Sequence, residues 1–126
     1  MKTASEILVH LNTTMERMIQ KPWMFTGNAQ EFEILCREYD NIILFILDAN
    51  NLYKSYGSGS LYQGYLAKYH DFGSGAFIET YLNDLIESGK ERPSERELFE
   101  MFSDHWRAYL LWRNTELRKH DISMPQ

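Results

Sequence analysis

Hydrophobic residues recur at helical spacing along almost the whole chain. The first segment, about residues 4–20, can be capped by Ser5 or Thr3, and Pro22 ends it because proline cannot continue a helix. Residues 23–25 are all apolar and predict a connector that packs onto the rest of the protein. The apolar face of this first helix consists of Ala4, Leu8, Leu11, Met15, Met18 and Ile19.

A second predicted helix begins near Gly27 or Asn28. Glu33 and Arg37 lie four residues apart on the side opposite its apolar sector, which predicts an ion pair at the surface. The run IILFIL, residues 42–47, is apolar all round, as in a helix buried on several sides. A short buried strand is the alternative for this run. The apolar sector consists of Phe32, Leu35, Tyr39, Ile42, Ile43 and Ile46.

Glycines and tyrosines are concentrated in residues 57–75, which hold five of the seven glycines. Tyrosines and leucines at helical spacing predict a short helix there, from about 60 to 70. The next helix covers about residues 75–88. Ser74 is its candidate N-cap, and Gly89 stands where a left-handed stop is expected.

The last helix, about residues 95–119, begins with a capping-box signature formed by Ser94 and Glu97. Long helices separated by short polar breaks predict an all-α protein. The expected architecture is a single-domain bundle of four main helices plus one short tyrosine-rich helix, with residues 1–126 as one domain. The apolar stripe of the last helix consists of Leu98, Phe102, Trp106, Tyr109, Leu110 and Leu117.

Charge and composition then narrow the function classes. The net charge is −5 and no cluster of Lys and Arg exceeds a pair, which disfavours binding to nucleic acid or to an anionic membrane. The longest apolar run, residues 42–47, is too short to span a bilayer. The single cysteine, Cys36, cannot form an internal disulfide, and no apolar signal segment is evident at the N-terminus. A cytoplasmic protein is therefore expected.

The four histidines do not occur at metal-ligand spacings, so neither a metal site nor a cofactor is predicted. Cys36 lies on the flank of a buried face, where cysteine usually behaves as a small hydrophobe. No nucleophile-elbow motif and no phosphate-binding glycine motif is present. The sequence thus yields no catalytic residues, although enzymatic activity is left open.

Arg113 falls near the middle of the apolar stripe of the last helix, where a buried guanidinium would need acceptors. One interpretation is that the helix end projects past the bundle and the side chain reaches water. The alternatives are an ion pair with Glu116 or with a carboxylate of another helix, or a place in a pocket for an acidic ligand.

Two functional hypotheses follow. The first is a small acidic protein-binding domain, similar in class to immunity or inhibitor proteins, that occludes a basic protein partner. Its aromatic patch would be flexible because glycines flank it, and its acidic face would steer association. The tyrosines could instead only pack onto the bundle, or form a homodimer interface. The proposed contact residues are Tyr62, Tyr65, Tyr69, Phe72, Glu97, Glu100 and Asp104.

The second hypothesis is a small-molecule or anion binder with a pocket at the start of the helix after Gly75, where backbone N–H groups could hold an anion. It requires residues far apart in sequence to converge on one cavity. These residues are His70, Asp71, Ser74, Gly75, His105 and Arg113. The identity of the partner or ligand, the oligomeric state and the order of the helices in space are not readable from the sequence.

Overall fold

The computed structural model describes residues 3–51, 60–72 and 75–119. Within these ranges the chain forms five α-helices and one 3-10 turn, and no strand. The elements in chain order are α1 (Ala4–Gln20), η1 (Pro22–Met24), α2 (Ala29–Ala49), α3 (Leu61–Tyr69), α4 (Phe77–Glu87) and α5 (Glu95–Lys119). The predicted all-α bundle of four main helices and one short helix is confirmed. The strand alternative for residues 42–47 is wrong, because α2 runs through them.

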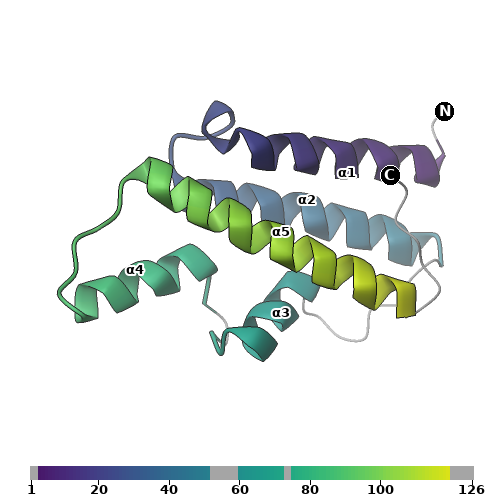
Figure 1. Cartoon of the computed structure of the whole chain (residues 1–126). Coiled ribbons are helices and arrows are strands. Elements are labelled where there is room, and N and C mark those ends of the chain that lie inside the picture. Colours follow the sequence, from purple (N-terminus) through teal and green to yellow (C-terminus); the bar gives the residue numbers. More distant parts are fainter. Residues whose placement is uncertain (1–2, 52–59, 73–74, 120–126) are drawn as a thin grey trace.

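The three long helices α1, α2 and α5 pack side by side, and α5 lies in front of α2 in the view of Figure 1. The two shorter helices cover the lower side of this layer: α3 packs on α5, and α4 packs on α2 and α5. The residues that the sequence analysis singled out therefore lie in two regions. One is the junction of α3 and α4 with α5, and the other is the face formed by α1, η1 and α5.

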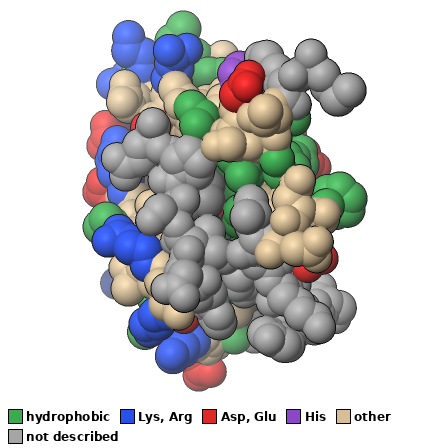
Figure 2. Space-filling view, turned by 90° about the vertical axis from the view of Figure 1, so that its right-hand side faces the viewer, with side chains coloured by type: hydrophobic (Ala, Val, Ile, Leu, Met, Phe, Trp, Pro, Cys, Tyr) green, Lys and Arg blue, Asp and Glu red, His purple; other side chains and the backbone are tan. Residues whose placement is uncertain are grey.

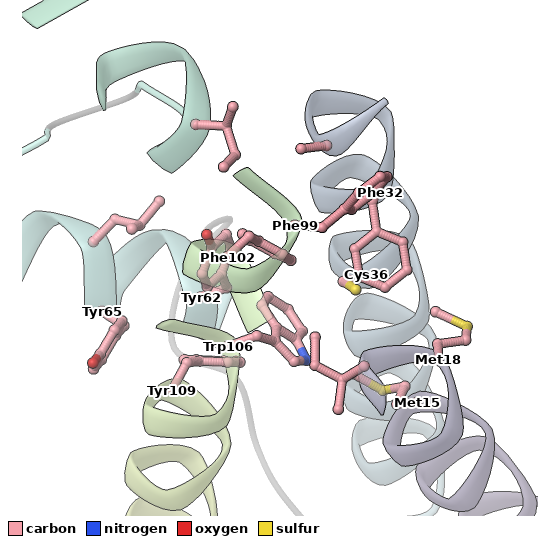
Figure 3. Close-up of a cluster of buried hydrophobic side chains, with 14 of the residues drawn as sticks. Met15, Met18, Phe32, Cys36, Tyr62, Tyr65, Phe99, Phe102, Trp106 and Tyr109 are labelled. Atoms are coloured by element: carbon pink, nitrogen blue, oxygen red, sulfur yellow. The ribbon is translucent and has the colours of Figure 1, made fainter. Parts of the chain in front are cut away.

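The core lies where these helices meet (Figure 3), and aromatic rings dominate it. Phe32 of α2 packs edge-on against Phe99 and Phe102 of α5, with both ring-centroid distances at 5.9 Å. Edge-to-face contacts of this kind add about 0.5–1.5 kcal/mol each beyond the burial of apolar area. The stripe predicted for the last helix is buried as expected, except that Leu110 is only half-buried.

The buried stripe of α2 is rotated relative to the predicted sector. It contains two carboxylates, Glu33 and Asp40, which are 1 % and 0 % exposed. Ile42 and Phe45, by contrast, are 47 % and 73 % exposed, so the run IILFIL is not buried on several sides. The full buried stripe is Ala29, Phe32, Glu33, Cys36, Asp40, Ile43 and Leu47.

Most helix ends follow the predicted capping chemistry. Thr3, rather than Ser5, caps α1, and the side chain of Asn28 accepts hydrogen bonds at the start of α2. Ser94 Oγ accepts a hydrogen bond from Glu97 N–H at 3.1 Å, as the capping-box signature predicts. The Glu97 carboxylate accepts from the Ser94 hydroxyl at 3.2 Å, and not from its backbone N–H. Gly89 adopts φ +70°, the left-handed stop that favours glycine.

The start of α4 differs from the prediction. The helix begins at Phe77, and its N-cap residue Ala76 provides no side-chain hydrogen bond. Ser74, the predicted cap, lies outside the described residues. Gly75 is required by a close approach, because a Cβ atom there would come within 2.7 Å of Thr80 Oγ1.

The connector after α1 also differs. Pro22 is buried, but Trp23, Met24 and Phe25 are 44 %, 70 % and 49 % exposed. A 3-10 turn has three residues per turn, so three successive side chains point in three directions and cannot all face the core. The prediction that this connector packs onto the protein is therefore wrong for much of its side-chain surface.

None of the helices in the described ranges combines the length and apolar character that a membrane crossing requires. On the face in Figure 2, described basic and acidic side chains are interspersed along one edge.

Candidate functional site

The tyrosines of α3 are mostly part of the core. Tyr62 is fully buried between Trp106 and Tyr109 of α5, with ring-centroid distances of 4.8 and 5.0 Å. Tyr65 is 9 % exposed, whereas Tyr69 is 52 % exposed. The prediction of an exposed recognition surface is therefore wrong for Tyr62 and Tyr65. The physical reason is that α3 lays one face on α5, and the large rings fill the space between the two helices.

The two remaining aromatic residues of the predicted patch lie at its edge. The Tyr69 hydroxyl accepts a hydrogen bond from the indole N–H of Trp112 at 3.2 Å. Phe72 is half-buried beside His70 and Phe77, with ring-centroid distances of 5.4 and 5.9 Å. Only a small part of the predicted aromatic patch is thus available to a partner.

The hydroxyl of Tyr62 connects to a buried carboxylate. It donates to Glu33 Oε2 at 2.9 Å. The same carboxylate accepts hydrogen bonds from the backbone N–H groups of Phe77 and Ile78, both at 2.8 Å. Glu33 on α2 therefore caps the first turn of α4 and holds α3 at the same point.

Glu33 and Arg37 were predicted to form an ion pair at the surface, but their contact lies at the edge of the core. Glu33 is buried, and Arg37 Nη2 lies 3.6 Å from Glu33 Oε2. The Arg37 guanidinium also lies 5.3 Å from the centroid of the Tyr62 ring. The pair thus lies against the buried side chains of Glu33 and Tyr62 instead of stabilising an exposed helix face.

The anion site predicted at the start of α4 is occupied by the protein's own carboxylate. Backbone N–H groups of a first helical turn bind anions because they have no partner within the helix. Here the groups of Phe77 and Ile78 already donate to Glu33. This part of the pocket hypothesis is therefore wrong.

The structure does bring His70 and His105 together, with ring centroids 5.1 Å apart. His105 stacks on Phe77 at 3.7 Å with an interplanar angle of 5°. Burial, together with the neighbouring His70, lowers the pKa of His105 to about 3. The imidazole is consequently neutral near pH 7. The Tyr62 hydroxyl has one proton, which it donates to Glu33, so it can only accept a hydrogen bond from His105. We therefore assign the His105 proton to Nε2, which lies 3.0 Å from the Tyr62 hydroxyl and donates to it.

None of the perturbed groups of this cluster suits acid–base or nucleophilic chemistry near neutral pH. Burial raises the pKa of the Tyr62 hydroxyl well above its usual range, and the charge of Glu33 adds to this shift. Burial likewise raises the pKa of the Cys36 thiol well above its usual range, so the reactive thiolate is disfavoured. The cluster therefore joins α2, α3, α4 and α5 as a structural element.

Arg113 is fully buried and lies away from the histidines. Its Nη1 donates to Asp40 Oδ1 at 2.7 Å, and Asp40 also accepts a hydrogen bond from the Tyr109 hydroxyl at 2.5 Å. Nη2 donates to Asn12 Oδ1 at 3.1 Å. The prediction that Arg113 reaches water is wrong, and the alternative of a carboxylate from another helix is confirmed. Arg113 binds Asp40 and Asn12, whereas His70 contacts His105, so the predicted convergence of Arg113 with the histidines is wrong.

Of the other members of that pocket, Ser74 lies outside the described residues. Asp71 is exposed and adopts φ +54°, a left-handed conformation that aspartate tolerates. Across the described ranges, no group of three or more His, Cys, Asp and Glu side chains is arranged to hold a metal ion.

The predicted acidic residues lie on the exposed side of α5, where they alternate with arginines. Glu100 is 3.6 Å from Arg96, and Asp104 is 3.3 Å from Arg107. Glu97 is engaged with Ser94 at the start of the helix. These carboxylates are accessible, but they form a mixed-charge face rather than a purely acidic one.

Next to this face lies a hollow of about 230 Å³ between η1 and α5. Trp23 forms one wall, and Glu100 and Asp104 contribute to another. The Arg96 guanidinium lies 4.6 Å from the centroid of the Trp23 ring, a cation–π contact that orients both side chains. Sequence reasoning missed this surface. The signal was present in residues 22–25, where a proline and three large apolar residues occupy a segment too short to bury them.

A comparison with protein-family models, with curated proteins and with solved structures finds no match to this chain. Function is therefore inferred from the geometry described above.

Proposed function

We propose that this chain is a small cytoplasmic protein-binding domain that occludes a protein partner, as immunity and inhibitor proteins do. The contact surface is the η1 face, defined as Trp23, Met24 and Phe25 together with the exposed carboxylates Glu97, Glu100 and Asp104. One observation supports this most directly. Three consecutive large apolar side chains stay 44–70 % exposed, and the first of them, Trp23, lines a hollow whose walls carry two of these carboxylates.

The apolar part of this face has the features of an interface core. Tryptophan and methionine are enriched at protein interfaces, and of the three side chains Trp23 is the one that lines the hollow next to the carboxylates. Trp23 is already oriented by Arg96, so less side-chain entropy would be lost on binding. This makes Trp23 the expected anchor.

The charged part supports a basic partner. The chain carries a net charge of −5, which would accelerate encounter with a positively charged surface. The ion pairs of Glu100 and Asp104 are exposed and contribute less than about 1 kcal/mol each. A partner could therefore replace Arg96 or Arg107 with its own basic groups at little cost.

The experiment is affinity capture from the source lysate with three full-length baits. These are the wild type, a variant with Trp23, Met24 and Phe25 changed to alanine, and a control with Ile34 and Phe45 changed to alanine. The control residues are 55 % and 73 % exposed on α2, so they match the apolar character of the η1 face at another place.

We expect a stoichiometric partner with the wild type and the control, lost in the η1 variant and weakened by added salt. The partner's own activity should fall when the domain is bound. Retention of the same partner by the η1 variant would contradict the proposed surface. The absence of any partner with the wild type would contradict the proposed function, and a two-chain mass in light scattering would identify a second copy as the occupant.

A further inference from the structure

The side of α2 opposite its buried stripe carries three large apolar side chains. Ile34, Ile42 and Phe45 are 55 %, 47 % and 73 % exposed. Ile42 lies eight residues after Ile34, and Phe45 follows three residues later, so the three form one row along the helix. Glu38 stands in the same row, four residues from each isoleucine. A row that extends along about three turns of one helix differs from apolar residues scattered singly over a surface.

Three carboxylates lie in or beside this row. Glu31, Glu38 and Asp48 are exposed, and within the described ranges no ion pair joins any of them to a basic side chain. Arg37, the only basic residue of α2, lies instead over the ring of the buried Tyr62. On the exposed side of α5, by contrast, carboxylates alternate with arginines that pair with them. The apolar row and its three uncompensated carboxylates are called the α2 face below.

These charges decide between possible occupants of the α2 face. A second copy would bring three carboxylates from each chain together without a basic group, which is unfavourable. An anionic membrane would be repelled for the same reason. A basic protein segment would place its cations opposite carboxylates that have no internal partner, so no existing ion pair would have to break. Because the apolar anchors follow a helical ridge, the segment that packs on them best is itself a helix.

We propose that the α2 face binds an amphipathic basic helix of a protein partner. The apolar side chains of that helix pack on Ile34, Ile42 and Phe45, and its lysines or arginines pair with the flanking carboxylates. This surface is separate from the η1 face, and the inference does not rest on the proposed function. Ile34 and Phe45 are the control positions of the capture experiment. Changing them should therefore release a helix bound to α2 while a partner of the η1 face is retained.

The probe is a fluorescein-labelled peptide of about 18 residues with leucine at helical spacing and lysine elsewhere. Fluorescence anisotropy follows its binding to the full-length wild type. We expect saturable one-to-one binding that weakens at least about tenfold between about 0.05 and 0.5 M salt. A peptide of the same composition without the helical spacing should bind at least about fivefold more weakly. Equal binding of the two peptides, or no saturable binding, would overturn the proposal.

A double variant tests the apolar row. Ile42→Ala with Phe45→Ala should weaken binding of the leucine–lysine peptide at least about fivefold, because two anchors lose most of their contact area. The matched control is Ile86→Ala with Leu111→Ala, at side chains 74 % and 72 % exposed on α4 and α5. It should change the affinity less than about twofold. Circular dichroism checks that both variants are folded, and equal affinities in the two would overturn the assignment to α2.

Two triple variants with the same change in net charge test the carboxylates. One converts the three carboxylates of the α2 face to amides and should weaken peptide binding at least about fivefold, with a smaller salt dependence. The control makes the same conversion at three exposed positions of α4, with Glu79→Gln, Asp84→Asn and Glu87→Gln. Equal weakening by both would show that net charge alone attracts the peptide and would overturn the proposal. A two-chain mass in light scattering that is lost in the Ile42 and Phe45 variant would make a second copy the occupant instead.

Discussion

Glu33 of α2 accepts a hydrogen bond at 2.8 Å from the backbone N–H of Ile78 in α4, 45 residues further along the chain. Helix caps usually come from the residue that precedes the helix. Here a carboxylate from another helix performs that role, because Ala76 provides no side-chain acceptor. The position of α4 thus depends on a contact between two helices rather than on its own local sequence.

Glu33→Ala should therefore destabilise the protein strongly. The change removes the acceptor of the Tyr62 hydroxyl and of two backbone N–H groups, all at least partly buried. We expect a loss of about 3–5 kcal/mol in the free energy of unfolding, measured by chemical denaturation.

The matched control is Glu31→Ala, an exposed glutamate two residues earlier on α2. It should cost less than about 1 kcal/mol. Hydrogen exchange gives an independent check, since the amides of Phe77 and Ile78 should lose protection in Glu33→Ala. Equal stability of the two variants would show that the carboxylate cap is unimportant.

The buried pair of Arg113 and Asp40 makes a second prediction. Arg113→Met leaves Asp40 as an uncompensated buried charge and should cost about 3–5 kcal/mol. The double variant Arg113→Met with Asp40→Leu removes both charges and should recover much of that loss.

Urea unfolding of the wild type, both single variants and the double variant completes the cycle. Additive losses, with no recovery in the double variant, would contradict a direct coupling between the two charges. Recovery would show that the two charges are coupled and that the ion pair adds little net stability over apolar side chains at the same positions.

The sequence predicted the helices well because their apolar periodicity is local. The stripe of α5 around Phe102, Trp106 and Tyr109 is buried as expected. The caps at Asn28 and Ser94 also follow from adjacent residues alone.

The candidate site was predicted poorly because it depends on contacts between distant segments. Glu33 and Asp40 occupy core positions of α2, and hydrophobic periodicity does not identify a buried carboxylate whose partners lie on α3, α4 or α5. Tyr62 was expected at the surface for the same reason, since its buried hydroxyl partner is 29 residues away. Met24 was expected to be packed, but no facing element covers its 70 % exposed side chain in the described part of the chain.

His105 makes a prediction about pH. Its pKa is about 3 in the folded protein, below the ordinary value of 6.5. Between these values the unfolded chain binds a proton that the folded protein does not, so stability is fully present above about pH 6.5 and falls on acidification. The contribution is at most about 1.4 kcal/mol per pH unit.

The measurement is the free energy of unfolding between pH 7 and about 5, for the wild type and for His105→Gln. This window is chosen because most carboxylates titrate at or below its lower end. Glutamine retains an N–H donor for the Tyr62 hydroxyl but does not titrate. The wild type should lose more stability than the variant over this interval. Parallel curves would show that His105 does not become neutral on folding.

The η1 face makes a prediction about stability as well as binding. Changing Trp23, Met24 and Phe25 to alanine should cost about 1–3 kcal/mol in the free energy of unfolding in total, because about half of the Trp23 and Phe25 side chains and most of Met24 are already in water. Phe32→Ala, at a fully buried ring, should cost about 3–5 kcal/mol in the same assay. Thermal and urea unfolding of both variants compare the two sites directly.

A large loss in the triple variant would mean that the three side chains stabilise the fold. The loss of partner binding in that variant would then no longer identify an interface. A small loss would show that the fold does not depend on these three side chains, and a loss of partner binding in the triple variant would then identify an interface at Trp23, next to Glu100 and Asp104.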